Sequence, residues 1–395
     1  MTFRLSFLAL NFILITGLFF PGNSIGLYLS TLVPFLILIN KNQGILKSNI
    51  ALILIIIFLT NIFLQTLLGY PPNIKLMLNF LGNLIMIYTI VGLLVSEFDF
   101  VKYLDGLLKL QVAIGIFIVI TGLLINGQNF FLINPNYIYV SIDQFLPLIS
   151  AQKQVLAPFM FFSGIMAIKL LKPNNLLKNL GIYFFIISAI FMSLGSRSVI
   201  LGIAVTTLIF IFRKYLSNIF ITSILFTIVT IAIGTANIFL ESYIDIIRLV
   251  DVRGVVYIEI VDEIIKNPFG IGYGNTISYL SQNNSALFSE TSFYFDDLKD
   301  SNEAFAQFDF ESFPINVESS ILILALEQGI FIVGLLYIFF VTKIARMFLA
   351  SKITVLYIIG FSVTFFTALT EDNFLLLPFL FYMALFLRAN ISRQK

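Results

Sequence analysis

The chain contains neither cysteine nor histidine. The absence of cysteine excludes disulfide bonds and zinc sites built on thiolates, although it indicates no particular compartment. The absence of histidine removes the side chain that most often acts as a general base, so an enzyme made from this chain needs another base.

Charged residues are also scarce. They make up 11% of the 395 residues, whereas 59% of the residues are hydrophobic and the mean hydropathy is +1.01. This hydropathy is far above what a soluble core needs, so the composition indicates a polytopic membrane protein. The net charge of +2 and the pI near 8.5 do not favour nucleic acid as a partner.

Apolar runs of roughly 17 to 25 residues recur along the chain, each long enough to cross a bilayer as a helix. They do not alternate with the period of two that a membrane β-barrel shows. The first run could pass for a secretory signal, but "FFPGNS" offers no convincing cleavage site and a second run follows at once, so we count it as a span. We predict an all-α polytopic transmembrane bundle of about twelve spans, over residues 3–20, 24–39, 50–69, 74–95, 107–125, 155–171, 176–194, 198–212, 219–240, 317–341, 353–369 and 374–387.

The distribution of lysine and arginine predicts the orientation. Sixteen of the 23 basic residues fall on alternate turns, and the positive-inside rule makes that side cytoplasmic, together with both termini. These sixteen are Arg4, Lys41, Lys47, Lys102, Lys109, Lys169, Lys172, Lys178, Arg213, Lys214, Lys343, Arg346, Lys352, Arg388, Arg393 and Lys395. The other side keeps Lys75, Lys153, Arg197, Arg248, Arg253, Lys266 and Lys299.

The large polar insertion covers residues 241–316, between the predicted ninth and tenth spans, and holds 13 of the 21 acids. A loop of this length in a tight bundle is more often functional than accidental, and a solvated cap is the alternative. The chain thus divides into spans over 1–240, this outer, partly helical loop, and spans over 317–395.

A second outer segment, 126–154, is nearly uncharged and rich in Asn, Tyr and Phe. The sequence leaves open whether that segment lies along the interface or dips back into the protein.

Arg197, in "SLGSRSVILG", lies at the predicted outer membrane surface, on the side that the charge bias avoids. An arginine within hydrocarbon costs about 2.5 to 3.5 kcal/mol on insertion scales, so its position calls for a reason. One interpretation is an arginine that extends to the interface. The other is a phosphate site, in which the planar guanidinium acts together with the N–H groups and positive dipole end of the next helix.

The stretch "DVRGVVYIEIVDEIIKNPFGIGYGN" covers residues 251–275. Over residues 253–266 the apolar residues recur at helical spacing, which predicts an amphipathic helix on the membrane or on the bundle. After this helix comes "NPFGIGYGN", in which a proline is followed by alternating glycines that form a turn. Such a turn lets backbone N–H groups approach a ligand closely, although without a flanking strand and helix it is no nucleotide fingerprint. The glycines that form it are Gly270, Gly272 and Gly274.

Two acids mark the predicted tenth span, "NVESSILILALEQGIFIVGLL". Glu318 lies at its outer surface, and Glu327 lies roughly 13 Å deeper. An acid at that depth must be protonated, paired or beside water. Glu327 therefore either locks neighbouring helices together or serves the site.

Taken in order, these stretches resemble the O-antigen polymerase and ligase superfamily of lipid-linked oligosaccharide glycosyltransferases. "LGSRSVILGIAV" is similar to the family's serine-arginine motif after a span. The run from Arg253 to Asn275 is similar to its motif of an arginine, an aromatic residue and then Asn-Pro with alternating glycines. "ESSILILALEQGIFIVG" is similar to the segment that opens the helix after the large loop. The resemblance covers the span count, the long outer loop and the order of the three motifs, which together are fairly specific.

One departure separates the branches of this family. The ligase branch, which transfers glycan to lipid A core, has a histidine where this chain has Glu318, and histidine is absent here. The resemblance therefore favours the polymerase branch. A weaker match places Lys153, ahead of Pro158, where the family often has an arginine, so the role of Lys153 stays open.

The resemblance implies polymerisation of undecaprenyl-diphosphate-linked repeat units into O-antigen or another surface polysaccharide, at the periplasmic face of the bacterial inner membrane. Arg197 and Arg253 would stabilise the leaving diphosphate, with Arg248 and Lys153 in reserve, and Glu318 would act as the base. The acceptor path would be lined by Gly272, Tyr273, Gly274 and Asn275.

The expected partners follow from the same reaction. They are the lipid-linked oligosaccharide and membrane lipid, with a chain-length regulator protein as a further candidate and no nucleic acid. The first outer loop, "PGNS", holds no acid that could bind a divalent ion, so we expect no metal and no other cofactor.

A flippase for the same lipid-linked sugars is the main alternative from another class. Such a transporter is expected to carry broken helices and paired charges near mid-membrane in both halves, whereas here only Glu327 is predicted to lie deep. An O-antigen ligase, a cell-wall glycan polymerase and a purely structural membrane scaffold are further alternatives.

The topology can be tested with one introduced cysteine, because the chain has none of its own. Asn302→Cys, in the predicted outer loop, should react with a membrane-impermeant maleimide in intact cells whose outer barrier has been opened. Labelling that occurs only after lysis of the inner membrane would contradict the predicted orientation.

Overall fold

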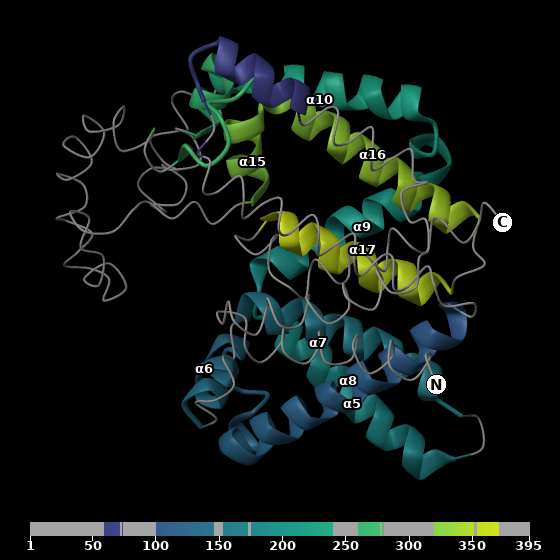
Figure 1. Ribbon diagram of the computed structural model, residues 1–395. Helices are drawn as coiled ribbons and strands as arrows, with labels where there is room; N and C mark the ends of the chain where they lie inside the picture. The colour runs from purple at the N-terminus through teal and green to yellow at the C-terminus, as the bar shows by residue number, and fades with distance from the viewer. Residues whose placement is uncertain are drawn as a thin grey trace, which may run out of the picture. The chain divides into compact units, whose positions relative to one another are not determined.

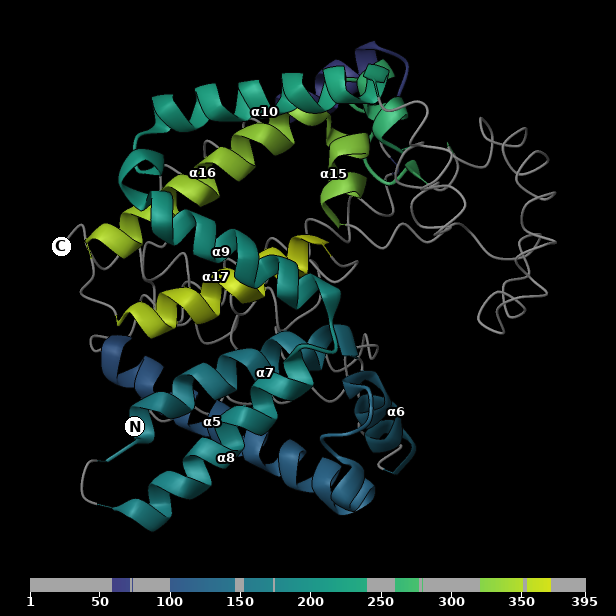
Figure 2. The same cartoon turned by 180° about the vertical axis from the view of Figure 1, so that it is seen from behind.

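The chain is seen here in a computed structural model, in which every described element is a helix (Figures 1 and 2). The helices fall into two compact units, which are described one at a time. The structure describes residues 59–71, 73, 100–145, 153–172, 175–239, 260–276, 279, 320–350 and 354–370.

The first unit is a bundle of mostly long, apolar helices. Helices suit such sequences because a helix satisfies its own backbone hydrogen bonds where water is absent. In chain order the elements of this unit are α5 (Phe100–Asn126), η2 (Gly127–Asn129), α6 (Pro135–Phe145), α7 (Lys153–Ala167), η3 (Ile168–Leu170), α8 (Leu176–Ser193), α9 (Arg197–Leu216), the last part of α16 (Ile330–Leu349) and α17 (Val355–Thr370).

Helices α7 and α17 form the centre of this unit. Helix α7 packs against α5, α8 and α17, and α17 also packs against α9. The rings of Phe162 and Phe361 meet edge to face between the two central helices, with centroids 5.0 Å apart. A β-carbon on Gly202 of α9 would lie 2.9 Å from the Val363 carbonyl oxygen. Glycine at this position therefore lets α9 lie directly against α17.

The buried hydroxyls of the central helices bond within their own helix. Ser163, Ser362, Thr364 and Thr367 each donate to the carbonyl oxygen four residues earlier, at 2.7 to 2.9 Å. These hydrogen bonds satisfy the hydroxyl groups in an apolar interior, so burying these polar side chains there carries only a small free-energy penalty.

The described part of segment 126–154, whose position the sequence leaves open, contains the short helix α6. Helix α6 packs on α5 and α8 and buries Ile138, Tyr139 and Ile142. The Tyr139 hydroxyl donates to the Met192 carbonyl oxygen at 2.9 Å. The segment thus forms an amphipathic helix that is bound to the bundle at the end of α8.

The second unit contains helical residues 59–67, α10 (Ile219–Phe239), helical residues 260–266, α15 (Ser320–Gln328) and the first part of α16. Of the segment predicted as an amphipathic helix over 253–266, the structure describes residues 260–266, which are helical. Ile260, Glu263 and Ile264 are buried there, whereas Asp262, Ile265 and Lys266 are exposed. The apolar core of this unit consists of Ile260, Ile264, Ile271, Ala325 and Leu326.

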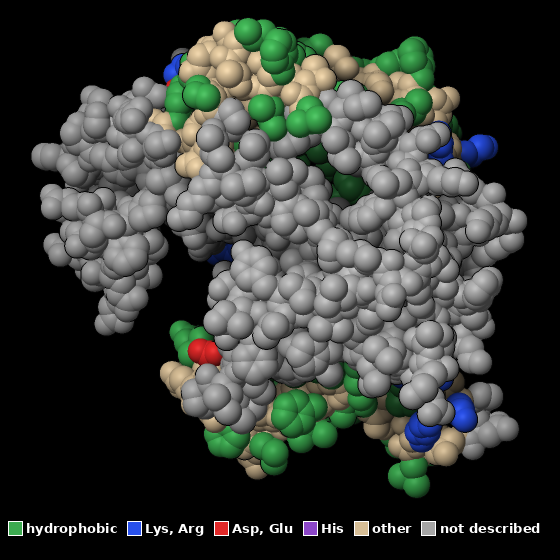
Figure 3. Space-filling model, viewed as in Figure 1, with side chains coloured by type: hydrophobic (Ala, Val, Ile, Leu, Met, Phe, Trp, Pro, Cys, Tyr) green, Lys and Arg blue, Asp and Glu red, His purple; other side chains and the backbone are tan. Residues whose placement is uncertain are grey.

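The coarse prediction of an all-helical membrane protein is confirmed. Four described helical segments are long and apolar enough to cross a bilayer: Leu108–Asn129, Leu176–Ser193, Arg197–Leu216 and Ile330–Leu349. Figure 3 shows apolar side chains over much of the described surface, as expected for helices that face acyl chains. Shorter apolar helices coincide with three further predicted spans, at Val155–Leu170, Ile219–Ala232 and Val355–Leu369. Outside the described residues lie the predicted spans 3–20, 24–39, 74–95 and 374–387 and most of the predicted loop 241–316.

The predicted continuous helix over 317–341 is wrong at one point. Helix α15 ends at Gln328 and α16 begins at Ile330. The residue between them, Gly329, has a φ of +87°, in the left-handed region that favours glycine and ends a right-handed helix.

Candidate functional site

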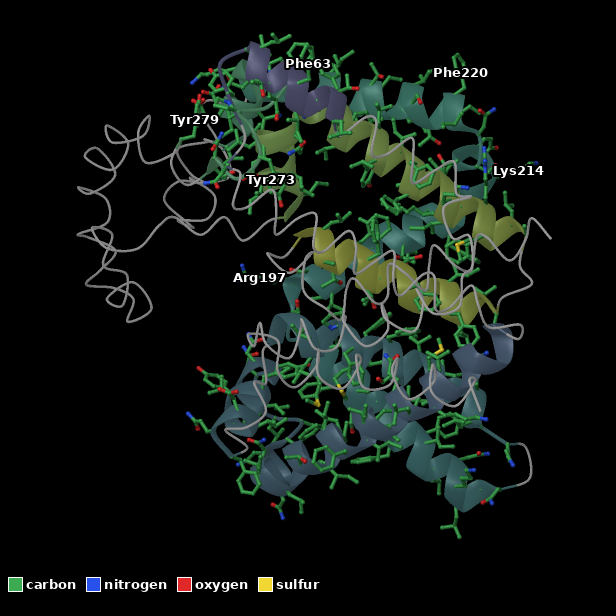
Figure 4. The ribbon with its side chains drawn as sticks, in the orientation of Figure 1. Phe63, Arg197, Lys214, Phe220, Tyr273 and Tyr279 are labelled. Atoms are coloured by element: carbon green, nitrogen blue, oxygen red, sulfur yellow. The ribbon has the colours of Figure 1, made fainter. Side chains whose placement is uncertain are left out.

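Arg197 is the first residue of α9 and follows the tight turn from α8. Its side chain is exposed and extends away from the start of the helix (Figure 4). The first N–H to donate along α9 is that of Ile200, which bonds to the Ser196 carbonyl oxygen at 3.3 Å. The N–H groups of Arg197 and Val199 therefore precede the first donor of the helix ladder. This corner therefore combines a guanidinium with the positive end of a 20-residue helix, which suits an anionic oxygen.

Two buried polar atoms near the turn that precedes Arg197 have no hydrogen-bond partner in the described part of the chain. They are the Oγ of Ser196, which caps α9 without a side-chain bond, and the Oδ1 of Asn136 at the start of α6. A β-carbon on Gly195 would lie 3.0 Å from Pro135 and 3.1 Å from Asn136 Oδ1, so this glycine brings the turn close to α6. Such unsatisfied atoms are uncommon in folded proteins, and they mark a place where a ligand or a water can complete the bonding.

The second predicted motif, the glycine loop (residues 268–276), packs onto the break between α15 and α16. The Ile271 N–H donates to the Leu326 carbonyl oxygen at 2.9 Å, and the Ile330 N–H donates to the Pro268 carbonyl oxygen at 3.1 Å. A helix break leaves backbone groups without partners inside the helix. In this protein the loop supplies partners on both sides of the break.

The glycines allow backbone to touch backbone at this contact. Gly270, Gly272 and Gly329 have φ values of +87°, +89° and +87°. A β-carbon on Gly270 would lie 2.5 Å from the Glu327 carbonyl oxygen, and one on Gly329 would lie 2.5 Å from a carbonyl oxygen of the loop. A β-carbon on Gly272 would lie 2.6 Å from the Tyr70 carbonyl oxygen, in the segment after helix 59–67. Any side chain at these positions would separate the segments.

Two amide side chains satisfy the last carbonyls of α15. Asn61 Nδ2 donates to the Gln328 carbonyl oxygen at 2.9 Å. Gln65 Nε2 donates to the Phe269 carbonyl oxygen at 3.0 Å and also to the Glu327 carbonyl oxygen. Both amides lie on helix 59–67, and both are buried. Three segments far apart in sequence therefore meet at the helix break.

The Glu327 carboxylate binds the glycine loop. Its Oε1 accepts a hydrogen bond from the Thr276 hydroxyl at 2.8 Å, and the N–H groups of Gly274 and Thr276 also donate to the carboxylate. A buried carboxylate needs such donors. Of the two interpretations of Glu327, these contacts favour the lock that holds neighbouring segments together.

The predicted substrate-path residues also hold segment 70–73. The Tyr273 carbonyl oxygen accepts from the Asn73 N–H at 2.8 Å. Asn275 Nδ2 donates to the Pro71 carbonyl oxygen at 2.8 Å. These described contacts explain the local fold, and contact of the same residues with a substrate stays a prediction.

The phenols of Tyr273 and Tyr279, whose side chains are labelled in Figure 4, both have raised pKa values. The Tyr279 hydroxyl donates to Glu263 at 2.7 Å, and Asn267 and Lys266 complete the bonds around this phenol and carboxylate. Burial, and then the bond to Glu263, raises the pKa of Tyr279 to about 12. Burial, and then the nearby Glu327 charge, raises the pKa of Tyr273. Both phenols therefore stay protonated at neutral pH.

The remaining predicted site residues are not placed. Glu318, Arg253 and Arg248 lie outside the described residues. Lys153 begins α7, and only its backbone is described. Their roles stay predictions, and Arg197 and the glycine loop belong to different units.

Sequence reasoning missed Asn61 and Gln65, which it treated as part of an ordinary span. The available signal was their spacing: two amides four residues apart fall on one helix face, and amides inside an apolar span usually bind a neighbouring segment. Ser196 and Asn136 were also missed, because nothing in the pattern places them beside each other.

No protein-family model, no curated protein and no solved structure matches this chain.

The close packing of the glycine loop can be tested by comparing three alanine substitutions. Gly270→Ala should prevent stable folding, because it adds a β-carbon 2.5 Å from a backbone oxygen to a residue at φ +87°. Gly69→Ala has the same backbone strain at φ +88° but no neighbour within 4 Å, and should cost only about 1 to 2 kcal/mol. Gly181→Ala, in the middle of α8 and also without neighbours, should be neutral or stabilising.

The readout is the yield of monodisperse protein in detergent and its melting temperature by circular dichroism at 222 nm. If Gly270→Ala and Gly69→Ala lower the yield and the melting temperature equally, backbone strain alone explains both effects. The close packing of Gly270 against the Glu327 carbonyl would then be wrong.

Proposed function

We propose that this chain is a membrane glycosyltransferase that polymerises undecaprenyl-diphosphate-linked oligosaccharides into O-antigen or another surface polysaccharide. It would act in the bacterial inner membrane, with its large loop in the periplasm. The single observation that carries the proposal is the exposed guanidinium of Arg197 at the N-terminus of α9. The order of the three sequence motifs gives further support.

The reaction needs positive charge at one point. A hydroxyl of one repeat unit attacks the anomeric carbon of the chain held on undecaprenyl diphosphate. The new glycosidic C–O bond forms while the bond from that carbon to the diphosphate oxygen breaks, so negative charge develops on the leaving diphosphate. Arg197 and the first N–H groups of α9 would stabilise this charge. Arg253 would be the second cation, with Arg248 and Lys153 in reserve.

The proton of the attacking hydroxyl needs an acceptor, and Glu318 is the proposed base. Tyr273 and Tyr279 cannot replace it, because the pKa of Tyr279 is raised to about 12 by burial and its bond to Glu263, and burial likewise raises the pKa of Tyr273. In this proposal Tyr273 and the glycine loop form a rigid wall of the acceptor path, held in place by Glu327.

A flippase for lipid-linked sugars is the second candidate, because the break at Gly329 is a feature expected of transporters. In transporters the free backbone groups of broken helices coordinate the cargo. Here Asn61, Gln65 and the glycine loop already bond to these groups. The helix break is therefore better explained as a structural contact between segments than as a site that binds a transported molecule.

The proposal is tested by Arg197→Ala and Arg197→Lys in a host whose long surface glycan depends on this protein. Arg197→Ala should reduce the rate of chain elongation by about 100-fold or more, as expected when a group that stabilises transition-state charge is removed. Arg197→Lys should be intermediate, because an ammonium keeps the charge and loses the planar fork. The exposed Lys178→Ala is the control and should behave as wild type.

The measurement is the length distribution of the glycan on gels, at matched protein levels. A polymerase defect should leave single repeat units on the surface, whereas a transport defect should leave none. Full-length ladders from both Arg197 variants would refute the diphosphate clamp, and complete loss of surface glycan would favour the flippase.

A further inference from the structure

Four cations gather where the ends of α9 and α16 meet in the first unit. Arg213 and Lys214 lie in the last turn of α9, and Arg346 lies in the last turn of α16 with Lys343 one turn before it. Figures 1 and 2 show the two helices ending on the same side, and Figure 4 shows Lys214 pointing outward there. We call these four residues the basic corner.

Three contacts hold the basic corner together. Arg346 Nε donates to the Ser217 carbonyl oxygen, just after α9, at 3.0 Å. The rings of Phe210 and Phe348 meet edge to face at 5.1 Å between the two helices. The Arg213 guanidinium lies 4.2 Å above the Phe210 ring and donates to the Phe210 carbonyl oxygen at 2.7 Å. Arg213 and Arg346 are therefore held in place by these contacts, and all four cations lie on helices and not on a loop.

The surrounding sequence provides little negative charge for this corner. No acid occurs between Asp143 and Glu241, a stretch that contains all of α9, or between Glu327 and Glu371, which contains all of α16. Lys343 and Arg346 lie close enough to repel each other.

Exposed apolar side chains adjoin the basic corner. Ile211, Phe212, Tyr215 and Leu349 are all exposed, on the same last turns of α9 and α16. Tyrosine at such a position is typical of the membrane interface. A molecule that fits both parts of this surface carries a negative headgroup together with hydrocarbon chains.

We infer that the basic corner binds an anionic diacyl phospholipid, with its headgroup phosphate among Arg213, Lys214 and Arg346 and its acyl chains along the exposed apolar residues. Juxtamembrane cations attract anionic lipids, and basic pockets between transmembrane helices select their headgroups. The sequence predicts that this lipid lies in the cytoplasmic leaflet, on the opposite side from Arg197. The site is thus independent of the proposed glycosyl transfer.

The inference is tested on the full chain purified in detergent, by native mass spectrometry with added phosphatidylglycerol. The double variant Arg213→Gln/Arg346→Gln should bind this lipid about 25-fold more weakly, from about fivefold for each lost cation. The matched control is Lys172→Gln/Lys178→Gln, which removes two exposed cations from another turn on the same predicted side and should leave the affinity unchanged. Phosphatidylcholine should bind weakly to all variants.

Three results would overturn the inference: an equal loss of affinity in the control, phosphatidylcholine bound as tightly as phosphatidylglycerol, or displacement of the lipid by inorganic phosphate alone. The last result would identify a site for free phosphate.

If circular dichroism shows that the double variant is unfolded, Lys214→Gln decides the question. Lys214 is exposed, so this variant should fold and lose about fivefold in affinity, and an unchanged affinity would contradict the inference.

Discussion

The backbone groups at the break between α15 and α16 must find partners in a place with little water, and this constraint shapes the second unit. Burying a carbonyl or N–H group without a hydrogen-bond partner in an apolar environment raises the free energy of the folded state by more than most single contacts lower it. The break is satisfied by the Ile271 and Ile330 bonds from the glycine loop and by the amides of Asn61 and Gln65. Each partner fixes the position of its own segment, so the helix break also sets the path of the loop.

The same bonds determine what the conspicuous residues of this unit can do. The alternating glycines resemble a ligand-binding turn, yet Gly270 and Gly329 bring two backbones together, and Glu327 is held by Thr276. By contrast, the Arg197 side chain is exposed at the start of α9. The proposed chemistry therefore depends more on the Arg197 corner, while the glycine loop provides rigidity.

Much of the fold was predictable from the sequence, because an apolar run of sufficient length in a bilayer has little choice but to be a helix. The helices over 176–193 and 219–239 match their predicted spans within a few residues. The break at Gly329 was not predictable, since glycine is ordinary in transmembrane helices and only its φ of +87° distinguishes it. The spacing of Asn61 and Gln65 indicated a bonding face, but the partner of Gln65 was not predictable, because Glu327 is 262 residues away and hydropathy carries no information about pairing. Arg197 was recognised at once because a lone charge in an apolar sequence is conspicuous.

The most direct test of this account is amide hydrogen exchange in a lipid nanodisc, measured at Ile271 and Ile330. Their N–H groups bond to the Leu326 and Pro268 carbonyl oxygens at 2.9 and 3.1 Å. If these bonds join the loop to the helix break, both amides should exchange as slowly as amides inside α16. Exchange at the rate of an open loop, with α16 itself protected, would contradict the account.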